Sequence, residues 1–240
     1  MRVAITGADG RIGGILRKRL SGRFEPRWLV RGDADVTDLD ALERALAGTD
    51  AVVHLAATAD VRAGWDEVHM ANVIGAYNAF EAARRAGVSR VVFASSNHVT
   101  GMTRWDDDRF ADPAHPIEVT TLDPIRPDSL YGASKAWGEA LGRQYAELHG
   151  LSVVCLRIGW VPEEDEPPSS TAMRWEPPKV ARRALGMWLS HRDCASLIEA
   201  ALLADVRFAI VNGVGDNRGR WLSLDEGRRL LGWEPLDGIR

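Results

Sequence analysis

The chain has 240 residues, of which 45% are hydrophobic and 27% are charged, and its formal net charge is −4 at pH 7. This length and composition predict a globular protein with a sizeable core and exclude a disordered chain. The slightly negative charge argues against nucleic acid as a partner, and no apolar run approaches the roughly 18 residues of a membrane span.

Short apolar runs and helical patterns alternate along the first two thirds of the chain. MRVAIT enters a strand at once, so we expect no signal peptide. A strand–helix rhythm of this kind predicts an α/β fold, a Rossmann-type doubly wound parallel sheet. The expected strands are 2–6, 26–30, 50–57, 89–96 and 151–159, and the expected helices are 11–21, 38–48, 65–86 and 128–149.

The pattern changes after Gly159. Residues 160–179 are rich in Pro, Glu and Ser and have no period, which predicts a long loop that serves as a lid or binding segment. Beyond it we expect a helix at 191–204, a strand at 207–213 and a short helix at 223–231. The predicted domains are an NAD(P)-binding Rossmann domain over residues 1–159, and a substrate lid with an interleaved C-terminal portion over residues 160–240.

Three glycines lie directly after the first expected strand and open the first helix. Gly7, Gly10 and Gly13 have the spacing G-x-x-G-x-x-G. The first permits a tight turn, the second a close approach of backbone to a pyrophosphate, and the third close helix–strand packing. The helix N-terminus then presents free N–H groups to the phosphates. A glycine-rich turn without a ligand is the alternative, but the position in the first strand–turn–helix unit favours a dinucleotide site.

The end of the second strand usually selects the dinucleotide, because an acidic residue bonds the ribose 2′-OH of NAD whereas an arginine suits the 2′-phosphate of NADP. Arg31 lies where the acidic residue would be, and Asp33 follows two residues later. Arg31 is either a phosphate contact or a solvated surface charge, so NAD and NADP both stay open. The candidate cofactor-binding residues are Gly7, Gly10, Arg11, Ile12, Gly13, Arg31, Asp35, Val36, Leu55, Ala56, Ala57, Tyr131, Lys135 and Ile158.

The candidate catalytic residues are Ser96, Tyr131 and Lys135. Ser96 ends the fourth expected strand, where ligands bind in a parallel sheet, and Tyr131 and Lys135 share one face of the helix at 128–149. A tyrosine with a pKa near 10 is a poor base at neutral pH, but a nearby ammonium favours its phenolate. We expect Tyr131 to take the proton of a substrate hydroxyl while hydride leaves to the nicotinamide. Lys135 would lower the pKa of Tyr131 and bond the nicotinamide ribose, and Ser96 would bond the substrate oxygen. The alternative is that Tyr131 and Lys135 only pack on an ordinary helix.

The motifs resemble a known family. The glycine turn, Ser96 and Tyr131-x-x-x-Lys135 are similar to those of extended short-chain dehydrogenases/reductases, which include the NAD-dependent epimerase/dehydratases. A closer resemblance, to uronate dehydrogenases and archaeal NAD-dependent glucose-6-phosphate dehydrogenases, is carried by FASSNHVTG, RPDSLYGASKAWGE, LRIG and MWLSHRDCASLIEA. It implies NAD as the cofactor and oxidation of C1 of a cyclic aldose, uronate or sugar phosphate to the lactone.

The same resemblance implies which residues contact the sugar. They are Ser96, Asn97 and His98, together with Arg183, whose guanidinium would grip a carboxylate or another anionic group, with Arg182 as its rival. Two serines of uronate dehydrogenases are replaced here by Ala59 and Trp160, so the sugar stays open. Trp160 is the last candidate substrate-binding residue, and it either stacks on a sugar face or packs in a loop.

Two other functions stay possible on this scaffold. One is a nucleotide-sugar epimerase or carbonyl reductase, although nucleotide-sugar enzymes usually have a larger C-terminal region. The other is a non-catalytic cofactor-binding protein, against which the intact Ser96, Tyr131 and Lys135 set argues. Cys155 and Cys194 are isolated, so we expect no metal site and a cytoplasmic location. We expect a homo-oligomer, in which the helices at 65–86 and 128–149 would form interfaces.

Overall fold

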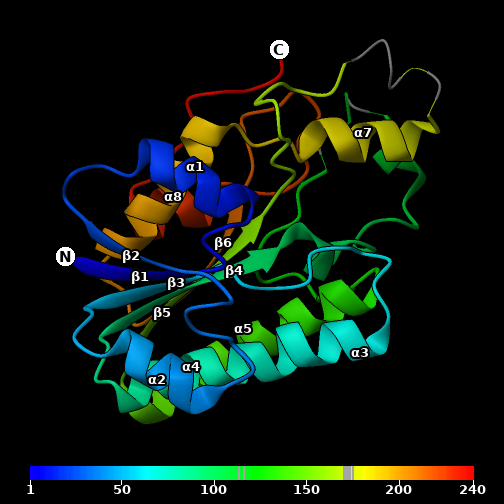
Figure 1. Ribbon diagram of the computed structural model, residues 1–240. Coiled ribbons are helices and arrows are strands. Elements are labelled where there is room, and N and C mark those ends of the chain that lie inside the picture. The colour runs from blue at the N-terminus through cyan, green and yellow to red at the C-terminus, as the bar shows by residue number, and fades with distance from the viewer. Residues whose placement is uncertain (113, 116, 170–173, 175) are drawn as a thin grey trace.

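The computed structural model of the chain is built on one six-stranded sheet (Figure 1). It describes residues 1–112, 114–115, 117–169, 174 and 176–240. The strand order is β2-β1-β3-β4-β5-β6, and every neighbouring pair is parallel, which confirms the predicted doubly wound α/β fold. The strands are β1 (Arg2–Thr6), β2 (Glu25–Leu29), β3 (Ala51–His54), β4 (Arg90–Ser96), β5 (Ser152–Ile158) and β6 (Phe208–Gly213).

Helices cover both faces of the sheet. In Figure 1, α1 and α8 lie over one face, and α2, α4 and α5 lie over the other. The α-helices are α1 (Arg11–Arg19), α2 (Leu39–Leu46), α3 (Trp65–Val68), α4 (Gly75–Arg85), α5 (Leu130–His149), α7 (Pro178–Gly186) and α8 (His191–Leu203). The remaining helical segments are η1 (His69–Ile74), η2 (Asn97–Thr100), η3 (Asp108–Ala111) and η4 (Gly227–Leu231).

Two hydrophobic cores follow from the alternation of side chains along the strands. Val3 and Ile5 of β1 pack in one core with α1 and α8, whereas Ala4 between them packs in the other core with α2, α4 and α5. Successive residues of a strand point to opposite faces, and both faces are covered, so the central strands read as continuous apolar runs. The cores hold the carboxyl ends of the strands in place, and the candidate residues gather at that edge.

The predicted helix at 65–86 is continuous in the chain but not regular. It consists of α3, the π-helical segment η1 and α4, and it ends at Arg85 before Gly87, whose φ is +70°. A π segment arises when a helix carries one additional residue, and the prediction of one helix over 65–86 did not include it. The third strand ends at His54 rather than at residue 57, which leaves residues 55–57 free to line a cavity.

The region after Gly159 also differs from its prediction. Residues 170–173 and 175 of the expected 160–179 loop lie outside the described residues, but α7 already begins at Pro178. Further along, β6 joins the same sheet as β1–β5, so the C-terminal portion extends the sheet. The division into domains at residue 159 stays a prediction. Among the described residues, no helix is long and apolar enough to cross a membrane.

Candidate active site

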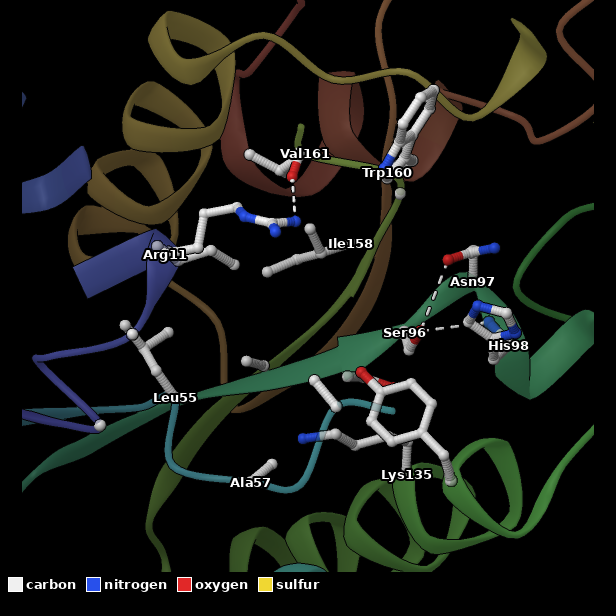
Figure 2. A pocket seen from close by; sticks show the side chains of 18 of the residues that line it. Arg11, Leu55, Ala57, Ser96, Asn97, His98, Lys135, Ile158, Trp160 and Val161 are labelled. Atoms are coloured by element: carbon white, nitrogen blue, oxygen red, sulfur yellow. Dashed lines mark hydrogen bonds between the residues drawn. The ribbon is translucent and has the colours of Figure 1, made fainter. Parts of the chain in front are cut away.

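A cavity of about 370 Å³ opens at the carboxyl ends of the central strands. Its wall combines the glycine turn, the ends of β4 and β5, and the first turns of α5 (Figure 2). In the figure, Ser96, Asn97 and His98 lie on one side, and Arg11 lies on the opposite side. The predicted residues that line it are Gly7, Gly10, Arg11, Ile12, Gly13, Leu55, Ala57, Ser96, Asn97, His98, Tyr131, Lys135, Ile158 and Trp160.

A second cavity, of about 320 Å³, continues the first across the glycine turn. The two share Gly7, Gly10, Leu55 and Ala57 in their walls. The predicted residues found only in the second are Arg31, Asp35, Val36 and Ala56. A groove with two lobes on either side of a glycine turn has the shape that a dinucleotide requires.

The glycine turn fits close approach by a phosphate. Gly7 has a φ of +65°, and a Cβ there would lie 2.7 Å from the backbone N of Ala56, so only glycine fits. A Cβ on Gly13 would lie 2.5 Å from the carbonyl oxygen of Ala8, so α1 packs directly on the turn. Gly10 is the N-cap of α1 and provides no capping side chain, so the N–H groups of the first turn remain available to an anion.

Lys135 is a buried ammonium at the floor of the first cavity. It is 3% exposed, and burial lowers its pKa to about 8. Its Nζ lies 5.0 Å from the ring centroid of Phe93 and 5.7 Å from that of Tyr131. These ring contacts offer no hydrogen-bond acceptor oxygen. Since a buried ammonium needs such acceptors, its position at the cavity fits a ligand with hydroxyl groups, such as a ribose.

Tyr131 does not show the lowered pKa that its spacing to Lys135 predicted. Burial raises the pKa of Tyr131, and a hydrogen bond with Ser96 offsets only part of that rise. Burial separates the phenol from water and disfavours the phenolate, so the nearby ammonium of Lys135 does not bring the pKa of Tyr131 below its ordinary value. At neutral pH Tyr131 is therefore a phenol that can donate to Ser96 or to a substrate oxygen.

Ser96 and the two residues after it form a short polar wall. Ser96 Oγ accepts a hydrogen bond from the His98 N–H at 3.2 Å and approaches Asn97 Oδ1 at 3.4 Å. The side-chain amide of Asn97 donates to Met187 Sδ. His98 packs edge-on against Tyr131, with the ring centroids 5.7 Å apart. Ser96 and His98 of this wall thus lie directly beside the phenol of Tyr131.

Arg183 is the one predicted site residue that lines neither cavity. It lies behind His98, with Nη2 at 3.5 Å from His98 Nδ1, and it pairs with Asp128. Its rival Arg182 is buried and has a structural role. It donates to backbone carbonyl oxygens, namely those of Arg109, Phe110, Asp112, His115 and Gly219. Of the two arginines, Arg183 is thus the one near the site.

The residues that hold the site together were not among the predicted site residues. Asn72 accepts a hydrogen bond from the N–H of Thr58 and donates to Ser134 Oγ, which in turn donates to the carbonyl oxygen of Tyr131. A polar residue on the buried face of a helix was the available signal. Sequence reasoning missed Glu139, Arg157 and Asp128. Arg157 interrupts the apolar run SVVCLRI, and a buried charge of that kind requires a partner.

Comparisons with known proteins agree along the whole chain. Residues 3–162 match the NAD dependent epimerase/dehydratase family. The chain is 40% identical to L-arabinose 1-dehydrogenase (NAD(P)(+)) of Haloferax volcanii, over 98% of this chain and 96% of that protein. It is 37% identical to the NAD-dependent glucose-6-phosphate dehydrogenase of the same organism, over 98% and 93%. A crystal structure of a mutant uronate dehydrogenase from Agrobacterium tumefaciens complexed with NAD is 32% identical, with a TM-score of 0.80, over 99% of this chain and 85% of that one.

Proposed function

The chain belongs to the NAD-dependent epimerase/dehydratase family, and we propose that it is an NAD(P)-dependent dehydrogenase that oxidises C1 of a cyclic sugar to the lactone. The family is the one that its motifs predicted. The relatives named as L-arabinose, glucose-6-phosphate and uronate dehydrogenases support an oxidoreductase that acts on a sugar with NAD or NADP.

One observation carries the proposal. Ser96, Tyr131 and Lys135 line one cavity together with the glycine turn. A hydroxyl, a phenol and an ammonium therefore border the same space as a phosphate-binding turn. An apolar binding pocket would not need the buried ammonium, and a purely structural tyrosine–lysine pair would not need the turn.

In the proposed reaction, Ser96 Oγ and Tyr131 Oη bond the C1 hydroxyl of the sugar. For this step Tyr131 first loses its own proton to solvent, and the phenolate then takes the hydroxyl proton as the C1–H bond breaks and the carbonyl of the lactone forms. When bound, the nicotinamide ring supplies the hydride acceptor. Lys135, which is charged below its pKa of about 8, stabilises the negative charge on Tyr131 and holds ribose hydroxyls.

The groove fits the dinucleotide through residues of this chain. The glycine turn and the N-terminus of α1 would hold the pyrophosphate, and Asp35 and Val36 would border the adenine ring. Arg31 is exposed at the wall of the same lobe and could bond a 2′-phosphate, so we propose that both NAD and NADP are accepted. Trp160, at the mouth of the first cavity, is 39% exposed and would stack on the sugar.

The test is to follow reduced cofactor by absorbance with NAD⁺ and NADP⁺ over a panel of aldoses, uronates and sugar phosphates. We expect turnover of at least one sugar, with the lactone as the product. The variant Tyr131→Phe should lower kcat about 10²–10⁴-fold, because it removes the proton acceptor, while NAD⁺ binding measured by calorimetry changes little.

The matched control is Tyr77→Phe, which removes the hydroxyl of an exposed tyrosine on α4 and should leave kcat unchanged. Absence of turnover with every sugar would refute the proposed function. Near-normal activity of Tyr131→Phe would remove Tyr131 from the mechanism and leave the dehydrogenase assignment standing.

We also propose a cytoplasmic homo-oligomer. Both cysteines are free thiols and buried, which suits a reducing compartment. Large apolar side chains are exposed on the adjoining helices α3, η1, α4 and α5, namely Trp65, Met70, Tyr77 and Trp137. Light scattering coupled to size exclusion would measure the mass directly.

A further inference from the structure

The segment from Trp160 to Asp165, which we call the strap, connects the proposed sugar site with α1. Its first two residues, Trp160 and Val161, line the first cavity. The N–H of Trp160 donates to the carbonyl oxygen of Met187 at 2.7 Å, and the N–H of Leu189 donates to the carbonyl oxygen of Trp160 at 2.9 Å. The start of the strap is therefore tied to the chain that follows α7.

The other end of the strap is held by α1 and α8. Arg19, the last residue of α1, pairs with Asp165 at 3.4 Å. The N–H of His191, the first residue of α8, donates to Asp165, and His191 Nε2 lies 2.8 Å from the carbonyl oxygen of Pro162. The side chains of Arg19 and Asp165 are 43% and 30% exposed, so their ion pair contributes little by itself.

Arg11 is the contact between the strap and the glycine turn. It is the first residue of α1 and follows the N-cap Gly10. Figure 2 shows its guanidinium at the carbonyl oxygen of Val161, to which Nη1 donates at 3.0 Å. Within the part of the chain that the structure describes, this is the one hydrogen bond of the Arg11 side chain, and no carboxylate pairs with it. A guanidinium has five N–H donors, so most of those of Arg11 are unused.

The unused donors of Arg11 border the expected pyrophosphate site. Arg11 and Gly10 line the first cavity together, and Gly10 leaves the N–H groups of the first turn of α1 uncapped. A phosphate bound there would attract the guanidinium, which can bond a phosphate oxygen through one N–H and keep another on a carbonyl oxygen.

Without a phosphate, the contact of Arg11 with the strap is weak. The side chain is exposed, and one hydrogen bond to a carbonyl oxygen must offset the entropy lost when a long side chain is held in one rotamer. A phosphate that fixes the guanidinium would remove that cost from the contact with Val161.

We propose that Arg11 is a positioning residue that couples the cofactor site to the sugar site: a dinucleotide at the glycine turn fixes Arg11, and Arg11 fixes the strap and with it the indole of Trp160. This inference rests on the proposed function. The sugar then binds more tightly to the enzyme that already holds its cofactor, and the sugar raises the affinity for the cofactor by the same factor, which we expect to be about fivefold or more.

The first test needs no sugar. Glu163 and Glu164 are exposed in the strap, and endoproteinase Glu-C can cut after them when the strap opens away from α1. Saturating NADH should slow cleavage at these two positions about fivefold or more in the wild-type chain, as measured by mass spectrometry of the fragments. Arg11→Met should remove this protection at NADH concentrations that saturate the variant.

The second test uses the sugar that is turned over fastest in the panel described above, at saturating NAD⁺. Arg11→Met should raise KM for that sugar about fivefold while kcat changes less than twofold, because Ser96, Tyr131 and Lys135 are untouched. Lys18→Met is the matched control. It removes another cation of α1, one whose ammonium has no hydrogen bond or ion pair among the described residues, and it should change neither KM nor the protection.

Circular dichroism would verify that each variant is folded. Protection by NADH that persists in Arg11→Met, or a sugar KM that stays at the wild-type value when the cofactor is saturating, would overturn the inference and leave the dehydrogenase function intact. Weaker NADH binding as the sole effect of Arg11→Met would overturn it in the same way. Absence of turnover with every sugar would instead refute the function itself.

Discussion

Two pairs of an arginine and a carboxylate flank the catalytic residues, and they differ mainly in burial. The side chains of Arg157 and Glu139 are 1% and 6% exposed, and those of Arg183 and Asp128 are 15% and 14% exposed. Arg157 and Glu139 form two hydrogen bonds of 2.8 Å, and Ser95 donates to the same carboxylate at 2.6 Å. That pair ties β4, β5 and α5 together beneath the cavity.

The comparison shows that an arginine–carboxylate pair can either hold a helix in place or orient a side chain in the cavity wall. Glu139 lies two helical turns after Tyr131 on α5, so its buried pair with Arg157 fixes the position of the helix that carries Tyr131. Asp128 lies just before α5 and bonds to both His98 and Arg183, so its pair holds the side chain of His98 in the cavity wall. Variants that break each pair should therefore differ in both size and kind of effect.

The largest effect is expected from Glu139→Gln. It leaves the guanidinium of Arg157 buried without a carboxylate, which should lower the free energy of unfolding by about 3–5 kcal/mol in urea titrations. Glu147→Gln, on the same helix but in the exposed pair with Arg143, should change it by less than about 0.5 kcal/mol.

A double variant refines this test. Glu139→Met with Arg157→Met removes both charges and should recover most of the lost stability, because no unpaired charge remains. Equal stability of the single and double variants would show that packing, and not the ion pair, accounts for the effect.

A smaller effect, about 2 kcal/mol at pH 7, is expected from Asp128→Asn. The pKa of Asp128 is about 2 in the folded chain against an ordinary value of 3.8, so its contribution to stability is full above pH 4 and is lost as the pH falls through 2. Urea titrations between pH 7 and pH 2 should show the wild-type and variant curves converging at the acid end. A difference that persists at pH 2 would contradict the ion-pair origin.

The smallest effect concerns salt. Raising NaCl from 0.1 to 1 M shortens the Debye length from about 10 to about 3 Å, but it screens buried charges little. The coupling energy of Asp128 with Arg183, from a double-mutant cycle, should fall by about 0.5 kcal/mol, and that of Glu139 with Arg157 should stay constant. Equal responses would show that the two pairs do not differ in solvent access.

The fold was largely predictable because its central strands are buried on both faces. Continuous runs such as RVAIT and VVFASS are typical of strands in a covered parallel sheet, and helical spacing separates them. Two features escaped. The π segment η1 was not part of the single helix predicted over 65–86, and α7 begins within a Pro-rich stretch, although proline at the first helical position is itself a start signal.

The parts of the candidate site that lie within short sequence motifs could be predicted. The glycine turn, Ser96 and the pair Tyr131–Lys135 each lie within a short motif, and the structure gathers them around one cavity. Asp128 and Glu139 could not be assigned, because their roles depend on Arg183 and Arg157, which are distant in sequence. The predicted direction of the Tyr131 pKa shift was wrong, because the shift depends on burial, which spacing along a helix does not reveal.

The π segment has a consequence for how the helix from Trp65 to Arg85 presents its faces. One residue more than an α-helix of the same span puts the side chains before and after it out of phase by about 100°. Ala76 and Phe80 pack in the core with α2 and α5, and Asn72, within the π segment, bonds to Thr58 and Ser134. The π segment therefore joins two parts of the molecule. The helix after it packs in the core, and Asn72 within it bonds to α5, the helix that carries Tyr131.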